Sequence, residues 1–120
     1  MMVITLNLDV ADLDRMETFW CAALGYRRLG SFEQYRSFVP VSGSGPKLVL
    51  QQVPEAKTVK NRMHIDLDHP ADFDVEGEVA RLEALGATRR SEYIREMGED
   101  SGWVVMADPE GNEFCVCGGC

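Results

Sequence analysis

Residues 4–28 read ITLNLDVADLDRMETFWCAALGYRR, and residues 63–90 read MHIDLDHPADFDVEGEVARLEALGATRR. Both stretches contain an alternating strand pattern, an Asp-rich turn, an amphipathic helix pattern, and then Leu-Gly before a segment with two arginines. The aligned pairs are Thr5 with His64, Asp12 with Asp72, and Gly25 with Gly86. A repeat of this kind predicts two similar structural modules within one chain.

The first repeat predicts a strand, a helix and three further strands. Asp12 is a suitable N-cap for a helix that runs to Leu24, and Gly25 is a suitable residue to end it. The predicted strands are Val3–Val10, Tyr26–Phe32, Tyr35–Val41 and Lys47–Val53.

The second repeat predicts the same order, with a helix over Phe73–Leu85. Its predicted strands are Met63–His69, Thr88–Ile94, Trp103–Ala107 and Glu113–Cys117. We therefore expect an α+β fold of two βαβββ modules, 1–53 and 61–120, within a single domain of residues 1–120. Paired modules would form a cupped, partly open mixed β-sheet barrel backed by helices, with a polar cup for a ligand.

Composition excludes several classes of function. Hydrophobic residues make up 45% of the chain and charged residues 27%, which is typical of a soluble globular domain. The sequence has no apolar run approaching the roughly 18–20 residues of a membrane span, and its N-terminus lacks a signal-peptide pattern. The net charge of −8 argues against nucleic-acid binding. A cytoplasmic protein without membrane or nucleic-acid partners is expected.

Three segments carry a resemblance to a known family: LDVADLDRMETFWCAALGY (8–26), KNRMHIDL (60–67) and DPEGNEFCV (108–116). With the βαβββ repeat, they resemble the vicinal oxygen chelate superfamily, which includes glyoxalase I, bleomycin-resistance proteins and extradiol dioxygenases. Among its members, the chain looks most like the glyoxalase-like domain proteins. The resemblance implies a homodimer.

The resemblance also implies where a metal would bind. The four usual ligand positions fall on Thr5, Val49, His64 and Cys115. Valine cannot bind a metal and threonine binds one poorly, so no metal and no other cofactor is expected. A divalent metal stays an alternative, in which case His64 and Cys115 would be its ligands.

Polar strand faces supply the candidate ligand-binding residues. His64 is a candidate for general acid–base catalysis, because Asp66 on the same face can orient its ring. Cys115 is expected to face His64 across the cup, as an activated thiol or as an inert core residue. A third interpretation is that His64 and Cys115 form half of a soft zinc or copper site, which Asp66 and Cys117 could complete. Trp103 is either a pocket wall or a packing residue. The candidate ligand-binding set is Thr5, Asn7, Val49, Gln51, His64, Asp66, Trp103 and Cys115.

Two functions from different classes therefore stay open. The favoured one is a glyoxalase-like protein that binds a small organic molecule with a degenerate metal site, as the bleomycin-resistance branch does. The alternative is a lyase, isomerase or dioxygenase that uses His64 with Asp66 or Cys115. The CxxC spacing of Cys117 and Cys120 is not taken as a redox motif, because it ends the chain rather than opening a helix.

Overall fold

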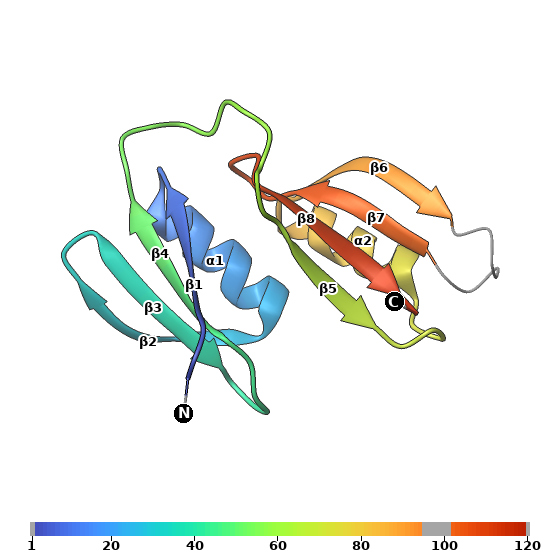
Figure 1. The fold of residues 1–120 in the computed structure, drawn as a ribbon, viewed down its shortest axis with the longest axis horizontal. Coiled ribbons are helices and arrows are strands. Elements are labelled where there is room, and N and C mark those ends of the chain that lie inside the picture. Colours follow the sequence, from blue (N-terminus) through green and yellow to red (C-terminus); the bar gives the residue numbers. More distant parts are fainter. Residues whose placement is uncertain (1, 95–101, 120) are drawn as a thin grey trace. The chain divides into compact units, whose positions relative to one another are not determined.

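The structure is a computed structural model that describes residues 2–94 and 102–119. The chain folds into two compact units, Met1–Ala56 and Lys57–Cys120, which we call the N-terminal and C-terminal modules. Each module has one helix and four strands among these residues (Figure 1). Cys120 lies outside the described residues, so the CxxC interpretation is not tested.

The N-terminal module has a four-stranded sheet in the order β1-β4-β3-β2. Its β1 pairs in parallel with β4, and the remaining pairs are antiparallel. The elements are β1 (Thr5–Val10), α1 (Leu13–Leu24), β2 (Tyr26–Phe32), β3 (Tyr35–Pro40) and β4 (Lys47–Gln52).

The C-terminal module repeats this topology in the order β5-β8-β7-β6, with β5 parallel to β8. Its elements are β5 (Ile65–His69), α2 (Val75–Leu85), β6 (Thr88–Ile94), β7 (Gly102–Ala107) and β8 (Glu113–Gly118). The predicted α+β class with two βαβββ modules is confirmed, each module forming a mixed four-stranded sheet.

Aspartate caps and left-handed glycines delimit both helices. The Asp12 side chain accepts a hydrogen bond from Arg15 N, and Gly25 ends α1 with φ 70°. In α2, Asp74 accepts from Gly77 N, and Gly86 is the terminating glycine with φ 117°. Such a cap satisfies a backbone N–H that has no partner within the helix.

The predicted start of α2 at Phe73 is wrong by two residues. The Phe73 N–H donates to Pro70 O in a turn, and the Phe73 ring stacks on His69 with 3.7 Å between ring centroids. Tertiary packing therefore holds Phe73 outside the helix, and the structural counterpart of Asp12 is Asp74 rather than Asp72.

One face of each sheet packs against its helix. On β8, Phe114 and Val116 are fully buried, and a Cβ atom on Gly118 would lie 2.9 Å from Val75 of α2. On β3, Arg36 pairs with Asp14 and Glu17 of α1, so Arg36 faces the helix. Because side chains alternate along a strand, the intervening residues lie on the opposite face, which we call the open face.

The two modules also share an irregularity in the strand after the helix. The β2–β3 register shifts between Arg28 and Gly30, and the β6–β7 register shifts between Arg89 and Ser91. Both arginines pair with a helix glutamate, Glu17 for Arg28 and Glu76 for Arg89. The repeat thus extends to the contacts between helix and sheet.

Among the residues that the structure describes, no helix has the length and apolar character needed to cross a membrane.

Candidate functional site

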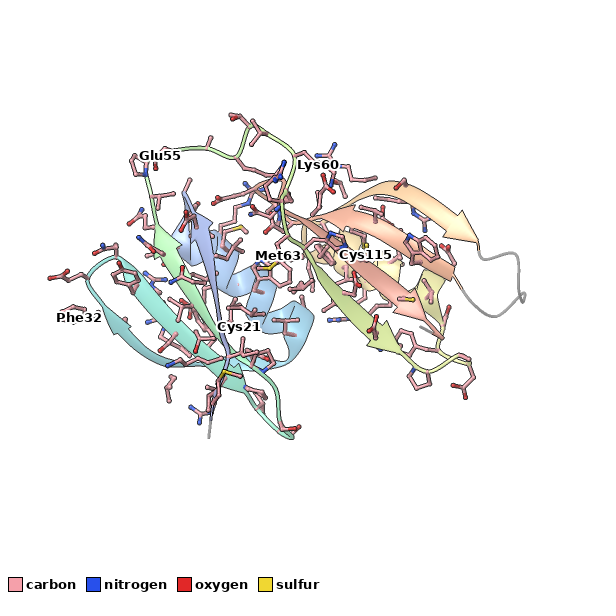
Figure 2. All side chains as sticks on the ribbon, viewed as in Figure 1. Cys21, Phe32, Glu55, Lys60, Met63 and Cys115 are labelled. Carbon is pink, nitrogen blue, oxygen red and sulfur yellow. The ribbon has the colours of Figure 1, made fainter. Side chains whose placement is uncertain are left out.

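Strand register brings three of the predicted residues together on the open face of the C-terminal module. Asp66 of β5 and Cys115 of β8 are register partners in the parallel pair. His64 lies just before β5, and its Nε2 is 3.2 Å from Asp66 Oδ1. One potential ligand atom from each of the three lies within 4.8 Å of the other two. Figure 2 shows Cys115 on β8, beside β5.

Cys115 was expected to face His64 from across a cup, and this placement is wrong. The two residues lie on the same side of one sheet, because β5 and β8 are adjacent strands. The cluster of His64, Asp66 and Cys115 therefore lies within a single module.

The exposures of the three side chains differ. The His64 and Asp66 side chains are 42% and 54% exposed, whereas Cys115 is only 6% exposed. A small molecule can therefore reach the imidazole and the carboxylate directly, whereas the buried Cys115 is nearly inaccessible.

The thiol of Cys115 is held in its protonated form. Burial raises the pKa of Cys115 to about 11, and the charge of Asp66, a hydrogen bond with Asp66 and the charge of Glu113 act in the same direction. A nucleophilic cysteine needs a lowered pKa, so Cys115 by itself is a poor nucleophile at neutral pH.

The segment before His64 is anchored to the start of β8. Lys60 Nζ donates to Glu113 Oε2 at 2.6 Å, and the Glu113 N–H donates to Asn61 Oδ1 at 3.1 Å. The Lys60 hydrogen bond lowers the pKa of Glu113, although desolvation opposes it, and the charges of Lys57 and His64 add to the lowering. These contacts fix the chain immediately before the candidate site.

A buried turn sets the start of β8. Asp108 Oδ1 accepts from the backbone N–H groups of Glu110 and Asn112, and the Asn112 side-chain amide donates to both Asp108 carboxylate oxygens. Gly111 takes the left-handed conformation, with φ 90°, that an L side chain rarely adopts. The Asp-Pro-Glu-Gly-Asn sequence thus has a structural role that positions Glu113 and Cys115.

The other candidates lie on the open faces as well. In the N-terminal module the register partners are Thr5 with Lys47, Asn7 with Val49, and Asp9 with Gln51. In the C-terminal module, half-buried Trp103 of β7 is the partner of Cys117, and Cys115 is the partner of Val105. Trp103 is therefore one strand away and two residues along from Cys115, and not within the three-residue cluster.

The metal site implied by the resemblance does not fit the residues present. Its N-terminal positions are Thr5 and Val49, and the register partner of Thr5 is the cationic Lys47. Hydroxyl and aliphatic side chains next to a lysine offer no suitable ligands for a divalent cation. The C-terminal positions, His64 and Cys115, do bear ligand atoms.

His69 was not identified as notable from the sequence. It lies on the helix side of β5, where its ring stacks on Phe73 and its Nε2 is 3.7 Å from Glu78 Oε2. That nitrogen is buried and has no hydrogen-bond partner among the described residues. Strand alternation placed His69 with Ile65 and Leu67, which was an available signal for a core histidine.

Comparison with known proteins identifies the family. The model of the glyoxalase-like domain matches residues 5–117, nearly the whole chain. The chain therefore belongs to the glyoxalase-like domain family of the vicinal oxygen chelate superfamily, and the resemblance noted from the sequence is confirmed. No curated protein matches the sequence.

Solved structures show the same fold at low sequence identity. The fosfomycin resistance protein FosX from Listeria monocytogenes is 18% identical, with a TM-score of 0.81 over 100% of this chain and 94% of that one. A glyoxalase/bleomycin resistance protein/dioxygenase family enzyme from Burkholderia phytofirmans PsJN is 17% identical, with a TM-score of 0.76 over 97% of each chain. A mutant of the Listeria protein was solved with Mn(II) and 1S,2S-dihydroxypropylphosphonic acid, and it also has a TM-score of 0.81, with 18% identity over 99% of this chain and 90% of that chain.

Proposed function

We propose that this glyoxalase-like protein binds a small organic molecule on the open face of the C-terminal module, through His64 and Asp66. The observation that carries the proposal is the 3.2 Å contact between His64 Nε2 and Asp66 Oδ1, formed by two side chains that stay accessible. A carboxylate that fixes the imidazole leaves the other ring nitrogen available to a ligand.

Charge on this face favours a particular kind of ligand. Asp66 lies on β5 and Glu113 starts the neighbouring strand β8, with Lys60 as the nearby cation. Carboxylates repel anions and accept hydrogen bonds, so we expect a neutral or cationic ligand with hydroxyl or amine donors. This sets the metal-free protein apart from the Listeria relative that was solved with a phosphonate. Trp103 is the proposed contact for a flat part of the ligand.

The test is a ligand panel in buffer with EDTA, measured by thermal shift and calorimetry. The panel contains vicinal diols, aromatic amines and dihydroxypropylphosphonate. We expect binding of a diol or an amine, and loss of that binding in His64→Ala and Asp66→Asn. Asp68→Asn is the matched control, because it removes a carboxylate two residues further along the same strand. Full affinity in both His64→Ala and Asp66→Asn would exclude this site.

The His64–Asp66 contact also favours a second candidate function, general acid–base catalysis. Here the chain would be a lyase, isomerase or dioxygenase in which His64 moves the proton and Asp66 orients its ring. Cys115 would not act as the nucleophile, because its pKa is raised to about 11. Loss of a positioned base typically lowers turnover by about 10²–10⁴-fold. Turnover retained in His64→Ala on any substrate found would exclude this role.

The remaining predictions concern the wider protein. The shared ligand cup that would include Thr5, Asn7, Val49 and Gln51 stays a prediction, as do the homodimer and the cytoplasmic location. Sedimentation analysis tests the dimer, and Asn7→Ala and Gln51→Ala in the same ligand assay test the participation of the N-terminal module.

A further inference from the structure

We propose that His64, Asp66 and Cys115 form a binding site for a zinc-class divalent cation, held entirely by the C-terminal module. The three residues supply an imidazole nitrogen, a carboxylate oxygen and a sulfur. Zinc and cobalt accept this mixture of ligands, whereas manganese prefers oxygen ligands. The donor set therefore differs in kind from one suited to the Mn(II) in the Listeria relative.

The geometry needs only small side-chain movements. Ligand atoms about 2.0–2.3 Å from a tetrahedral zinc ion lie about 3.3–3.8 Å from one another. The three atoms lie within 4.8 Å of one another, so they need to approach by at most about 1.5 Å. His64 and Asp66 are accessible enough to rotate, while Cys115 is fixed within β8.

The backbone around the three ligands is already fixed. Asp66 and Cys115 are partners in the β5–β8 ladder, so their separation is set by the sheet. His64 follows the segment that Lys60 and Asn61 tie to Glu113. A site of this kind loses little backbone entropy when it takes up an ion.

Local charge favours a cation at this position. One Asp66 carboxylate oxygen lies within 4.8 Å of the Cys115 sulfur, and Glu113 lies two residues before Cys115 on the same face of β8, so the negative field of both carboxylates acts at this position. The same field attracts a divalent cation, and a bound cation would stabilise the thiolate. Lys60 opposes this field, but it is paired with Glu113.

Three protein ligands leave one tetrahedral position for water or for a ligand oxygen. This inference uses the same face as the proposed organic-ligand site but does not depend on it, because the cation is bound without an organic molecule. It departs from the family pattern by using Asp66, and by using no residue of the N-terminal module.

The test is metal binding by the full-length, untagged protein after treatment with EDTA. Calorimetry with Zn²⁺ should give one equivalent per chain, and Mn²⁺ should bind at least about tenfold more weakly. Co²⁺ should produce a thiolate-to-cobalt charge-transfer absorption, which reports the sulfur ligand directly.

Matched variants locate the ion. His64→Ala and Cys115→Val should lose the zinc equivalent, and Cys115→Val should lose the cobalt charge-transfer band. Asp66→Asn should weaken zinc binding at least about tenfold, whereas Asp68→Asn should leave it unchanged. Cys21→Ser, which removes a thiol from the N-terminal module, should also retain it.

Several outcomes would overturn the site. These are absence of zinc binding, full binding by Cys115→Val, a cobalt complex without the thiolate band, or loss of binding in Cys21→Ser. Because Asp66 is a surface residue, Asp66→Asn tests the site even if Cys115→Val does not fold. The ligand panel is measured in EDTA and the metal titration without organic ligand, so either proposal can fail alone.

Discussion

On the open face of the N-terminal module, the partners at the middle of the parallel strand pair are Asn7 and Val49; in the C-terminal module they are Asp66 and Cys115. Two residues earlier, Thr5 and Lys47 stand where the C-terminal module has His64 and Glu113. At these four positions the N-terminal module is therefore neutral to cationic, and the C-terminal module has two carboxylates, a thiol and an imidazole.

The helix-covered faces differ much less. Both modules have the same strand order, an aspartate N-cap, a left-handed glycine at the helix end, and an arginine that pairs with a helix glutamate. The fold that the two modules share therefore depends on the helix-covered face, where packing constrains the sequence. The open faces differ more, and among the described residues the cluster of potential metal-ligand atoms lies in the C-terminal module.

The largest expected effect comes from copying the C-terminal open face onto the N-terminal one. The variant combines Thr5→His, Asn7→Asp, Lys47→Glu and Val49→Cys. If the cluster alone makes the metal site, zinc stoichiometry should rise from one to two equivalents per chain, as measured by calorimetry. Adding His64→Ala to this variant should restore one equivalent. A stoichiometry that stays at one would mean that the open-face residues are not sufficient.

The next largest effect concerns the buried residues of the helix-covered faces, which are similar in the two modules. Phe114→Ala removes a fully buried ring, and should lower the free energy of unfolding by about 3–5 kcal/mol. Its N-terminal counterpart is Leu48, for which Leu48→Ala should cost about 2–5 kcal/mol. Urea unfolding measures both changes. A negligible cost at either position would contradict the assignment of these faces to the core.

A smaller effect is a pH dependence of the free energy of unfolding. Cys115 should cause it, whereas its N-terminal counterpart Val49 has no ionisable group. The folded-state pKa of Cys115 is raised from an ordinary value of 9.0 to about 11. The neutral thiol therefore adds stability that is fully present below pH 9 and is lost as pH rises towards 11, because the unfolded chain ionises first. The loss should be about 2–3 kcal/mol.

Urea unfolding of metal-free protein between pH 8 and 11 measures that loss. Cys115→Val, which installs the residue of the N-terminal module, is the control for the other groups that titrate in this range. An identical pH dependence in the two proteins would show that the thiol is not perturbed.

The smallest effect tests whether the two helix caps are equivalent. Asp12→Ala and Asp74→Ala should each cost about 1 kcal/mol, because each leaves a backbone N–H without its side-chain partner. Asp72→Ala should cost much less, since Asp74 and not Asp72 caps α2. A larger loss of stability in Asp72→Ala than in Asp74→Ala would instead support the alignment of Asp12 with Asp72.

Local signals made most of the fold predictable. Alternation located the strands, and Asp12, Gly25 and Gly86 marked helix ends with known backbone requirements. The start of α2 was missed because the stacking of Phe73 on His69 depends on tertiary packing.

Residue type and strand face made His64, Asp66 and Cys115 predictable as candidates. Their proximity was not, because the partnering of Asp66 with Cys115 depends on the long-range register of β5 and β8. A shift of one residue in that register would have turned Cys115 away from Asp66. The raised pKa of Cys115 likewise follows from burial, which the sequence did not determine.

The contacts of Val53 and Lys60 have a consequence for assembly. The Val53 N–H donates to Val10 O, and Lys60 binds Glu113, so six residues (54–59) connect one anchored module to the other. Such a tether spans at most about 25 Å. Each module therefore experiences the other at an effective concentration in roughly the millimolar range when the tether can span the distance. At micromolar protein concentration, any pairing with a module of a second chain would therefore have to compete with pairing inside one chain.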